Sequence, residues 1–255
     1  AAAAELRIVA RLGVGHDQID VPAATRHGVA VAMAFGTNHE AVADHAFALM
    51  ATLASSLTVY DRRVREGGWG SLAHGRLHGT TVGLVGFGRI GRAVAKRCQG
   101  FAMRVLVHDP LLDATTLGHL GCTPVGLDEL LAQSDFVSLH APLLPATRHL
   151  IDATAALSRM KRSAYLINTA RGPLVKEGAL ADALEQKVIA GAATDDAPRV
   201  ETERLLHNPN HICTPHLGNR AIEGVRAVSR FAIQNAIDVL QGRRPDHVLN
   251  PEVYD

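Results

Sequence analysis

The sequence predicts an α/β fold built on a doubly wound parallel sheet, and three observations carry this prediction. From Thr80 onward, short apolar runs alternate with stretches of helical periodicity. The runs are almost continuously apolar, which is typical of strands that are buried on both faces of a parallel sheet. A glycine-rich motif, Gly86-Phe87-Gly88-Arg89-Ile90-Gly91, stands between one such run and the helical stretch that follows it.

The composition limits the class of protein. Hydrophobic residues make up 47% of the 255 residues, charged residues 20%, and the net charge is +1. This is typical of a globular protein with a sizeable core and room for two modest domains. Basic residues are scattered and only 4% of residues are aromatic, so we expect no nucleic-acid or membrane partner. Cys98, Cys122 and Cys213 have no paired spacing, which predicts reduced core residues in a cytoplasmic protein and no metal site.

The first part of the chain predicts a small α/β segment. Leu6–Ala10 and Val29–Met33 are apolar runs, and Val21–His27 between them allows one or two helical turns. Two strands cannot bury both faces of a sheet. We therefore expect this segment to be the end of a larger domain whose earlier strands are not in the given sequence.

A long helix is expected next. Thr37 and Glu40 have the spacing of a capping box. Apolar residues from Val42 to Val64 then recur at helical spacing, and Gly67-Gly68 ends the pattern. A helix of this length is long enough to bridge two domains.

The remainder of the chain alternates strands and helices. The predicted strands are Val82–Val85, Val105–Val107, Phe136–Leu139, Ala164–Ile167, Val188–Ala193 and His211–Cys213. The predicted helices are Arg89–Cys98, Leu127–Ala132, Ala155–Met160, Glu177–Leu184 and about Ala221–Gln241. Such alternation is the pattern of parallel strands joined by helical crossovers.

The glycine-rich motif predicts a dinucleotide site. Gly86 permits a tight turn, Gly88 lets a pyrophosphate approach the backbone, and Gly91 lets helix and strand pack closely. The N-terminus of the following helix offers free N–H groups to the phosphates. Asp109 ends the next predicted strand, 18 residues after Gly91. Its carboxylate suits a ribose diol and repels a 2′-phosphate, which favours NAD over NADP.

Two reactive side chains follow late strands. Arg171 comes just after the strand that ends near Ile167, and His216 comes just after His211–Cys213. Ligands of open parallel sheets bind beyond the carboxyl ends of the strands. The arginine fork suits a carboxylate with a neighbouring carbonyl, and histidine suits the proton that accompanies hydride transfer. The sequence therefore predicts a dehydrogenase acting on a 2-hydroxy or 2-keto acid.

These motifs resemble the D-isomer-specific 2-hydroxyacid dehydrogenase family along nearly the whole chain. The matching segments are Gly13-Val14-Gly15-His16-Asp17-Gln18-Ile19-Asp20, Glu40-Ala41-Val42-Ala43-Asp44-His45, Val85-Gly86-Phe87-Gly88-Arg89-Ile90-Gly91, Leu139-His140-Ala141-Pro142-Leu143, Ile167-Asn168-Thr169-Ala170-Arg171-Gly172 and Thr214-Pro215-His216-Leu217-Gly218. Several independent motifs in the family's order make the resemblance specific.

The resemblance implies an NAD-binding Rossmann domain, residues 69–221, inserted in a flavodoxin-like substrate domain. That second domain would comprise residues 1–68 and 222–255 and lack its N-terminal part. The implied reaction is hydride transfer between nicotinamide and a small D-2-hydroxy acid or 2-keto acid. The long helix would bridge the domains and help to form a homodimer.

The resemblance also implies roles for individual residues. Arg171 would bind the substrate carboxylate and carbonyl, and His216 would be the general acid/base. Backbone amides at Val14 and Gly15 would hold the substrate carboxylate, and Asp195 would face the nicotinamide carboxamide. The expected cofactor-binding residues are Gly86, Gly88, Arg89, Ile90, Gly91, Asp109, His140, Ala141, Pro142, Thr169, Asp195 and Gly218.

One part of the family pattern is missing. The family's third catalytic residue is a Glu that pairs with the histidine, and the family spacing counted from Arg171 reaches Val200 instead. Glu201 is the first candidate for the partner carboxylate and Glu203 the second; the alternative is that both are surface acids. This departure keeps open a second function, that of a catalytically weak, NAD(H)-sensing binding module. A formate-oxidising type is disfavoured, because no Gln stands near this position.

Overall fold

The computed structural model describes residue 3 and residues 5–70, 73–152 and 156–255. Two compact units are present, one of residues 1–41 with 219–255 and one of residues 42–218. The sequence-based boundary at residues 68 and 69 differs from this division. The reason is α2 (His39–Ser55), which buries Ala46, Met50 and other apolar residues in the core of the larger unit.

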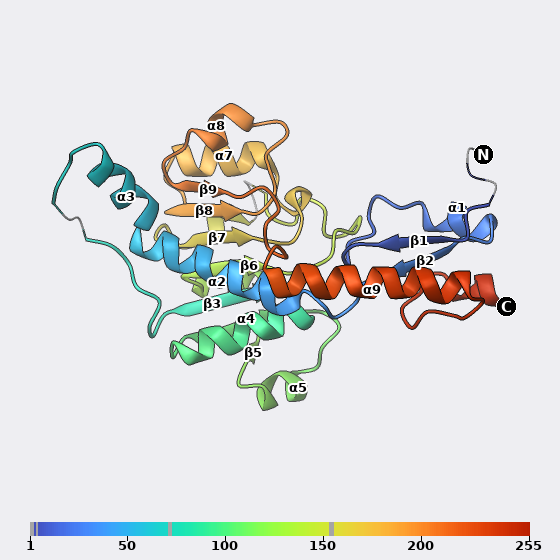
Figure 1. Ribbon diagram of the computed structural model, residues 1–255. Coiled ribbons are helices and arrows are strands. Elements are labelled where there is room, and N and C mark those ends of the chain that lie inside the picture. Colours follow the sequence, from blue (N-terminus) through green and yellow to red (C-terminus); the bar gives the residue numbers. More distant parts are fainter. Residues whose placement is uncertain (1–2, 4, 71–72, 153–155) are drawn as a thin grey trace. The chain divides into compact units, whose positions relative to one another are not determined.

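The larger unit is built on a seven-stranded parallel sheet in the order β5-β4-β3-β6-β7-β8-β9 (Figure 1). Its strands are β3 (Thr81–Val85), β4 (Arg104–His108), β5 (Thr123–Pro124), β6 (Phe136–Leu139), β7 (Tyr165–Asn168), β8 (Gly191–Thr194) and β9 (His211–Cys213). Within this sheet the chain passes from β3 outward to β4 and β5. It then crosses back to β6, beside β3, and continues in the opposite direction to β9. The order therefore reverses between β3 and β6, which is where open parallel sheets bind ligands.

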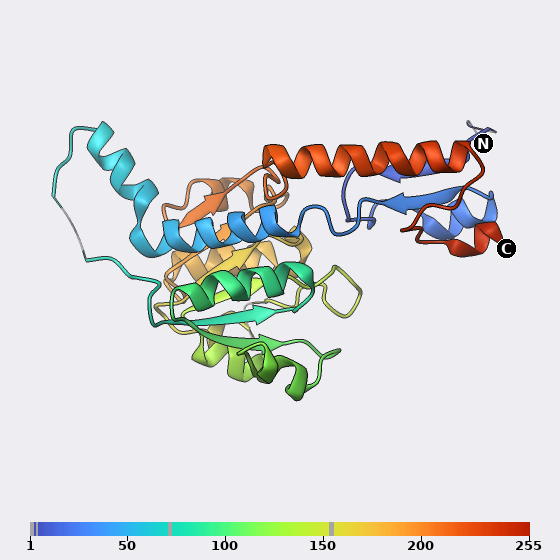
Figure 2. The same ribbon diagram turned by 60° about the horizontal axis from the view of Figure 1, so that its bottom comes forward.

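Both faces of this sheet are buried, as the apolar runs predict. In β4, Val105 and Val107 join one hydrophobic cluster and Leu106 joins the other. Figure 2 shows α2 and α4 on one side of the sheet. The helices of the larger unit are α2, α3 (Leu57–Arg65), α4 (Arg89–Gly100), α5 (Ala114–His119), α6 (Leu127–Gln133), α7 (Glu177–Glu185) and α8 (Thr202–Leu206), with short 3-10 helices at Leu157–Arg159 and Gly172–Leu174. The doubly wound parallel fold is confirmed.

The single long helix expected from the capping box to Gly67 is wrong. Helix α2 ends at Ser55, Ser56 has a left-handed backbone (φ 53°), and α3 continues at an angle of 60°. The hydroxyls of Thr52 and Ser55 donate to the carbonyls of Ala48 and Ala51, a pattern that bends helices. At the other end, α2 begins at His39, and the hydroxyl of Thr37 donates to the carbonyl of Ala34.

Two further points concern the helices. Residues 153–155 lie outside the described part of the chain, so the start of the helix expected over Ala155–Met160 is not described; the rest forms the 3-10 turn Leu157–Arg159. No single helix of the described ranges is long and apolar enough to cross a membrane. Helices α2 and α3 meet that criterion only together, as a bent pair, by length and composition alone.

The smaller unit pairs β1 (Ile8–Arg11) with β2 (Ala30–Met33) in parallel, through α1 (Val21–Arg26). Helix α9 (Ile222–Leu240) packs against both strands, and a 3-10 turn, Pro251–Tyr254, ends the chain. Asn250 is fully buried and joins the C-terminal segment to the backbone of β2 and of the residue before it. Its Oδ1 accepts from the amide of Val31 at 2.8 Å, and its Nδ2 donates to the carbonyl of Val29 at 2.9 Å.

Candidate active site

One edge of the seven-stranded sheet collects the candidate residues in a row. The strand register places in line the last residues of six strands: His108, Val85, Leu139, Asn168, Thr194 and, on β9, Cys213. The next residue of each strand extends the row beyond the sheet: Asp109, Gly86, His140, Thr169, Asp195 and Thr214. Five members of this second row are cofactor-binding residues expected from the sequence. Sequence positions more than a hundred residues apart thus meet at the carboxyl edge.

The glycine-rich turn leaves room for a ligand at one of its three glycines. Gly86 has φ 90°, and a Cβ there would lie 2.7 Å from the amide nitrogen of Ala141. A Cβ on Gly91 would lie 2.5 Å from the carbonyl oxygen of Gly86. A Cβ on Gly88 would meet nothing within 4 Å. Gly86 and Gly91 are therefore required by packing, whereas Gly88 keeps space open at the N-terminus of α4, where Arg89 and Ile90 begin the helix.

Asp109 lies against the same turn. Its Oδ2 accepts a hydrogen bond from the amide of Phe87 at 2.7 Å, and its Oδ1 accepts one from the amide of Leu111 at 3.0 Å. The carboxylate is only partly buried. The carboxylate therefore holds the glycine-rich turn. At this place it can accept hydrogen bonds from a ribose diol and repels a 2′-phosphate.

His140 and Thr169 stand next to the reversal of strand order. The Nε2 of His140 lies 3.0 Å from the hydroxyl of Ser138, and burial lowers the pKa of His140 to about 4. The imidazole is therefore neutral at neutral pH. The Oγ1 of Thr169 is buried and has no hydrogen-bond partner within the described residues. A buried hydroxyl without a partner is costly, and a ligand group can satisfy it.

These features fit a dinucleotide. The open space at Gly88 and the N-terminus of α4 suit a pyrophosphate, and Asp109 suits a ribose. Thr169, whose hydroxyl lacks a partner in the described residues, and His140 belong to the same row of residues beyond the strand ends. The nicotinamide half of the dinucleotide would extend along this row. The residues present would therefore hold NAD along the carboxyl edge of the larger unit.

Arg171 follows β7 on a firmly bonded turn. Asn168 is 2% exposed; its Nδ2 donates to the carbonyl of Arg171 at 2.8 Å and its Oδ1 accepts from the amide of Ala170 at 3.1 Å. The amide of Gly172 donates to Oδ2 of Asp196 at 3.1 Å. The backbone on both sides of the partly buried Arg171 is thus fixed.

His216 follows β9 at the corresponding place. Arg171 and His216 each come three residues after the end of a strand, and those strands are separated only by β8, so the strand ends lie roughly 10 Å apart. The His216 side chain is exposed, and its backbone has φ 57°, which is uncommon for a residue other than glycine. Strained backbone of this kind is often found at functional sites.

Asp195 and Gly218 secure the loop that carries His216. Asp195 is only 4% exposed, and its carboxylate accepts from the amides of Leu217 at 2.7 Å and Gly218 at 2.8 Å. A Cβ on Gly218 would lie 3.0 Å from Oδ2 of Asp195, so the close approach needs a glycine. Both residues were expected to contact the cofactor; what the structure shows is that they hold the loop that carries His216.

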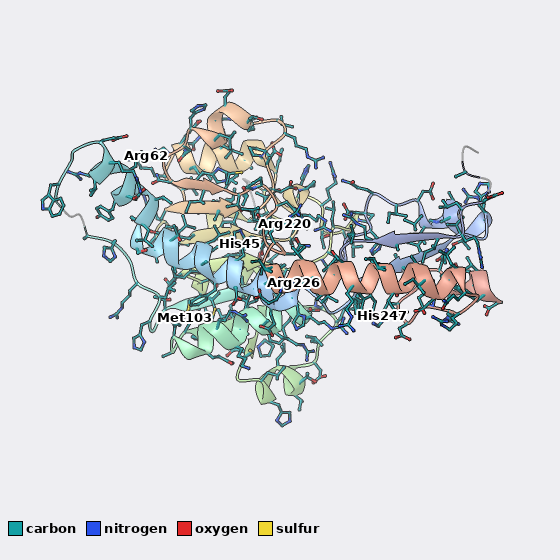
Figure 3. All side chains as sticks on the ribbon, viewed as in Figure 1. His45, Arg62, Met103, Arg220, Arg226 and His247 are labelled. Atoms are coloured by element: carbon teal, nitrogen blue, oxygen red, sulfur yellow. The ribbon has the colours of Figure 1, made fainter. Side chains whose placement is uncertain are left out.

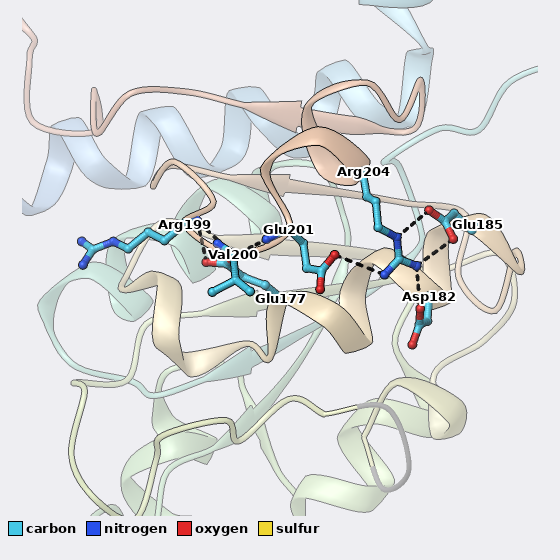
Figure 4. A network of polar contacts seen from close by, with 7 residues as sticks. All are labelled: Glu177, Asp182, Glu185, Arg199, Val200, Glu201 and Arg204. Atoms are coloured by element: carbon cyan, nitrogen blue, oxygen red, sulfur yellow. Dashed lines mark hydrogen bonds and ion pairs between the residues drawn. The ribbon is translucent and has the colours of Figure 1, made fainter.

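The expected partnership between Glu201 and His216 is not present. Oε2 of Glu201 accepts from Nη1 of Arg204 at 3.2 Å (Figure 4). Glu203 is exposed and pairs with His207 at 3.4 Å. Within the described ranges, no carboxylate forms an ion pair or hydrogen bond with the His216 ring. The cause is local, because Arg204 lies three residues after Glu201 and holds its carboxylate toward α7.

Glu177, at the start of α7, was not singled out from the sequence. Its carboxylate accepts from the amides of Arg199 at 3.0 Å, Val200 at 2.7 Å and Glu201 at 3.1 Å (Figure 4). Burial alone would raise the pKa of Glu177, but these three amides outweigh it and the pKa is lowered. An ionised Glu177 therefore holds the irregular segment in place. Val200, the residue at the family's Glu position, is 81% exposed.

The segment around Val14 and Gly15 lies after β1 in the smaller unit. The carbonyl of Gly13 accepts from the amide of Ala34 at 3.1 Å, and the carbonyl of Gly15 accepts from Nε of Arg11 at 3.0 Å. The amides of Val14 and Gly15 donate to nothing in the described part of the chain. They are free to bind an anion. The described residues hold no group of three or more His, Cys, Asp or Glu side chains suited to a metal ion.

Comparison with known proteins also indicates an NAD-binding domain. The model of the D-isomer specific 2-hydroxyacid dehydrogenase NAD binding domain matches residues 47–218, which nearly coincide with the larger unit. A glyoxylate reductase from Korarchaeum cryptofilum is 41% identical over 261 residues, covering 99% of this chain and 78% of that protein.

Solved structures agree in fold over almost the whole chain. A glyoxylate reductase from Paecilomyes thermophila has a TM-score of 0.86 at 34% identity and covers 98% of this chain and 76% of its own. The apo-structure of D-lactate dehydrogenase from Escherichia coli has a TM-score of 0.86 at 31% identity, covering 95% and 78%. The chain therefore belongs to the D-isomer specific 2-hydroxyacid dehydrogenases, NAD-dependent enzymes that transfer a hydride between nicotinamide and a small hydroxy or keto acid.

Proposed function

We propose that this protein reduces a small 2-keto acid of the glyoxylate type with NADH, using Arg171 to bind the substrate and His216 to deliver the proton. One observation carries the proposal. The glycine-rich turn, the Arg171 turn and the His216 loop all leave the same edge of one sheet, at strand ends that lie in register. Relatives named glyoxylate reductase support the substrate class.

The two side chains divide the work. The Arg171 guanidinium is permanently charged, and its planar fork binds the substrate carboxylate and polarises the neighbouring carbonyl. Bound NADH supplies the hydride to the carbonyl carbon. His216, as imidazolium, gives its proton to the carbonyl oxygen, and the product is a 2-hydroxy acid. The free amides of Val14 and Gly15 in the smaller unit are further candidates for binding the substrate carboxylate.

The lack of a carboxylate partner for the His216 ring, within the described residues, favours a second candidate function. A carboxylate partner normally orients such a ring and stabilises the imidazolium. Here Glu201 is held by Arg204, so His216 has no such support in the described part of the chain. This observation favours a protein that binds NAD(H) tightly but turns over slowly, acting as an NAD(H)-dependent binding module.

We also propose a homodimer in the cytoplasm. Helix α3 buries none of its residues, and Leu57 and Val64 are more than half exposed, as is Trp69 just after the helix. A second copy of the chain would cover these side chains.

The cysteines support the proposed location in the cytoplasm. All three are free, and burial raises the pKa of Cys98 to about 12. Cys98 is therefore an unreactive thiol, which suits a reducing compartment.

The experiment that tests the proposal is NADH oxidation against a panel of glyoxylate, pyruvate, hydroxypyruvate, 2-ketoglutarate and phosphohydroxypyruvate. We expect turnover with the smallest keto acids and a product of D configuration wherever the product is chiral. Tight NADH binding without turnover on any member of the panel would contradict the proposal and support the binding module.

A further inference from the structure

A single buried carboxylate, that of Asp195, organises the loop after β9. Besides the amides of Leu217 and Gly218, it accepts a hydrogen bond from the hydroxyl of Thr214 at 2.6 Å. Residues on both sides of His216 are therefore tied to one group, whereas the His216 ring itself stays exposed. The loop is held at its base, and its functional side chain projects from it.

His45, which lies on α2 (Figure 3), adds a contact to this cluster from another element. Its Nε2 lies 3.0 Å from Oγ1 of Thr214 and 3.4 Å from Oδ1 of Asp195. His45 is partly buried, and its two neighbours, Asp195 and Thr214, directly follow β8 and β9 of the same unit. The cluster thus connects α2 to the loop that carries His216.

Proton counting fixes the role of His45 in these contacts. The Thr214 hydroxyl has one proton and gives it to Asp195, so toward His45 it can only accept. The Nε2 of His45 must therefore carry a hydrogen and donate it. Burial alone would raise the pKa of Asp195, but donors from His45, Thr214, Leu217 and Gly218 outweigh it and the pKa is lowered. Asp195 is consequently ionised at neutral pH and needs these donors.

We propose that His45 is a positioning residue, which holds the loop bearing His216 through Thr214 and Asp195 in the geometry that proton transfer requires. The inference rests on the proposed role of His216. His216 has an uncommon left-handed backbone, and such a conformation persists only where the surroundings enforce it. Removing the donor of His45 leaves the buried Asp195 carboxylate and the partly buried Thr214 hydroxyl with one donor fewer, so the loop loosens.

The variants His45→Leu and His45→Gln separate this role from simple packing. Both residues are good helix formers of about the size of histidine, but only Gln keeps an N–H group in reach of Thr214 and Asp195. We expect His45→Leu to lower kcat by roughly tenfold to a hundredfold, because a small displacement of a catalytic group has this effect, with a much smaller change in KM. His45→Gln should stay within about threefold of the native kcat. His207→Gln, at an exposed histidine, is the control.

A second pair of variants tests the route through Thr214. Thr214→Val removes the hydroxyl that lies between His45 and Asp195. The kcat of the double variant His45→Leu/Thr214→Val should be only slightly lower than that of the less active single variant, because both changes break the same connection. Losses that multiply would overturn the route through Thr214.

Hydrogen exchange of the Leu217 and Gly218 amides supplies a readout without turnover. We expect faster exchange at these amides in His45→Leu and native exchange in His45→Gln. A native kcat in folded His45→Leu, native exchange in that variant, or equal damage by Leu and Gln would each overturn the inference. If the native protein turns over no keto acid, the proposed function fails, while the exchange comparison still decides whether His45 holds the loop.

Discussion

At the scale of single residues, the three motif glycines have different reasons to be glycine. A side chain at Gly86 or Gly91 would collide with backbone, whereas a side chain at Gly88 would enter open space. A requirement for glycine that packing does not explain points to a ligand. We attribute it to the pyrophosphate of NAD, the group that approaches the backbone of glycine-rich turns of this kind.

This difference leads to a prediction about Gly88→Ala. The variant should fold with native stability but bind NADH about tenfold or more weakly, because the new methyl group occupies the space of the phosphates. Fluorescence titration with NADH and a thermal melt measure the two effects. Gly100→Ala is the matched control, since Gly100 ends the same helix and also has open space around it. Native NADH affinity in Gly88→Ala would contradict the assignment of this turn.

His140 predicts a loss of stability in mild acid. Burial lowers its pKa from 6.5 to about 4, so between these values the unfolded chain binds a proton that the folded chain does not. Stability is therefore complete above the unfolded pKa and falls as the pH drops toward the folded pKa. From about pH 7 to about pH 5 this residue should account for a loss of about 1–2 kcal/mol. Urea unfolding of native protein and His140→Gln at both pH values measures it, and an equal pH dependence in the two would refute the prediction.

At the scale of elements, α7 serves as the anchor of the segment after Asp195. Glu177 binds the backbone of Arg199, Val200 and Glu201, and Arg204 binds Asp182 at 2.6 Å and Glu185 at 2.7 Å (Figure 4). This network fixes the segment, although the Glu of the family pattern is missing from it. It also explains why Glu201 points to α7 rather than to His216.

Removing this anchor should cost stability. Glu177→Ala leaves three backbone amides without their acceptor, and we expect a loss of about 1–2 kcal/mol in the free energy of unfolding. Chemical denaturation measures the loss. Glu203→Ala is the control, because that carboxylate is 88% exposed and should change stability little. Equal stability of the two variants would show that Glu177 does not hold the segment.

The sequence predicts the elements that follow from continuous apolar runs and turn residues. The strands from β3 to β9 were expected, except β5, whose two residues are too few to form a pattern. The break at Ser56 was missed, because it depends on hydroxyls folding back onto helix carbonyls. In the site, the strand-end residues were foreseen, whereas the roles of Glu177 and His45 were not. Their functions arise from contacts between distant elements, for which a single sequence carries no signal.

At the scale of the whole molecule, the exposed apolar residues of α3 predict a dimer. Leu57 and Val64 lie on a helix that buries no residue of its own. We expect the native chain to run as a dimer in light scattering, and Leu57→Asp/Val64→Asp to run as a monomer, because charges at these positions oppose burial. A native monomer, or a variant that remains dimeric, would contradict a dimer built through α3.

The account as a whole depends on Arg171 and His216 acting together beside a bound nicotinamide. The most direct test compares NADH affinity and keto-acid turnover in Arg171→Ala and His216→Ala. Each variant should lose about a hundredfold or more in kcat/KM, because each removes a group that acts in the transition state, while NADH binding stays near native. Native turnover in either variant would contradict the roles assigned to these two side chains.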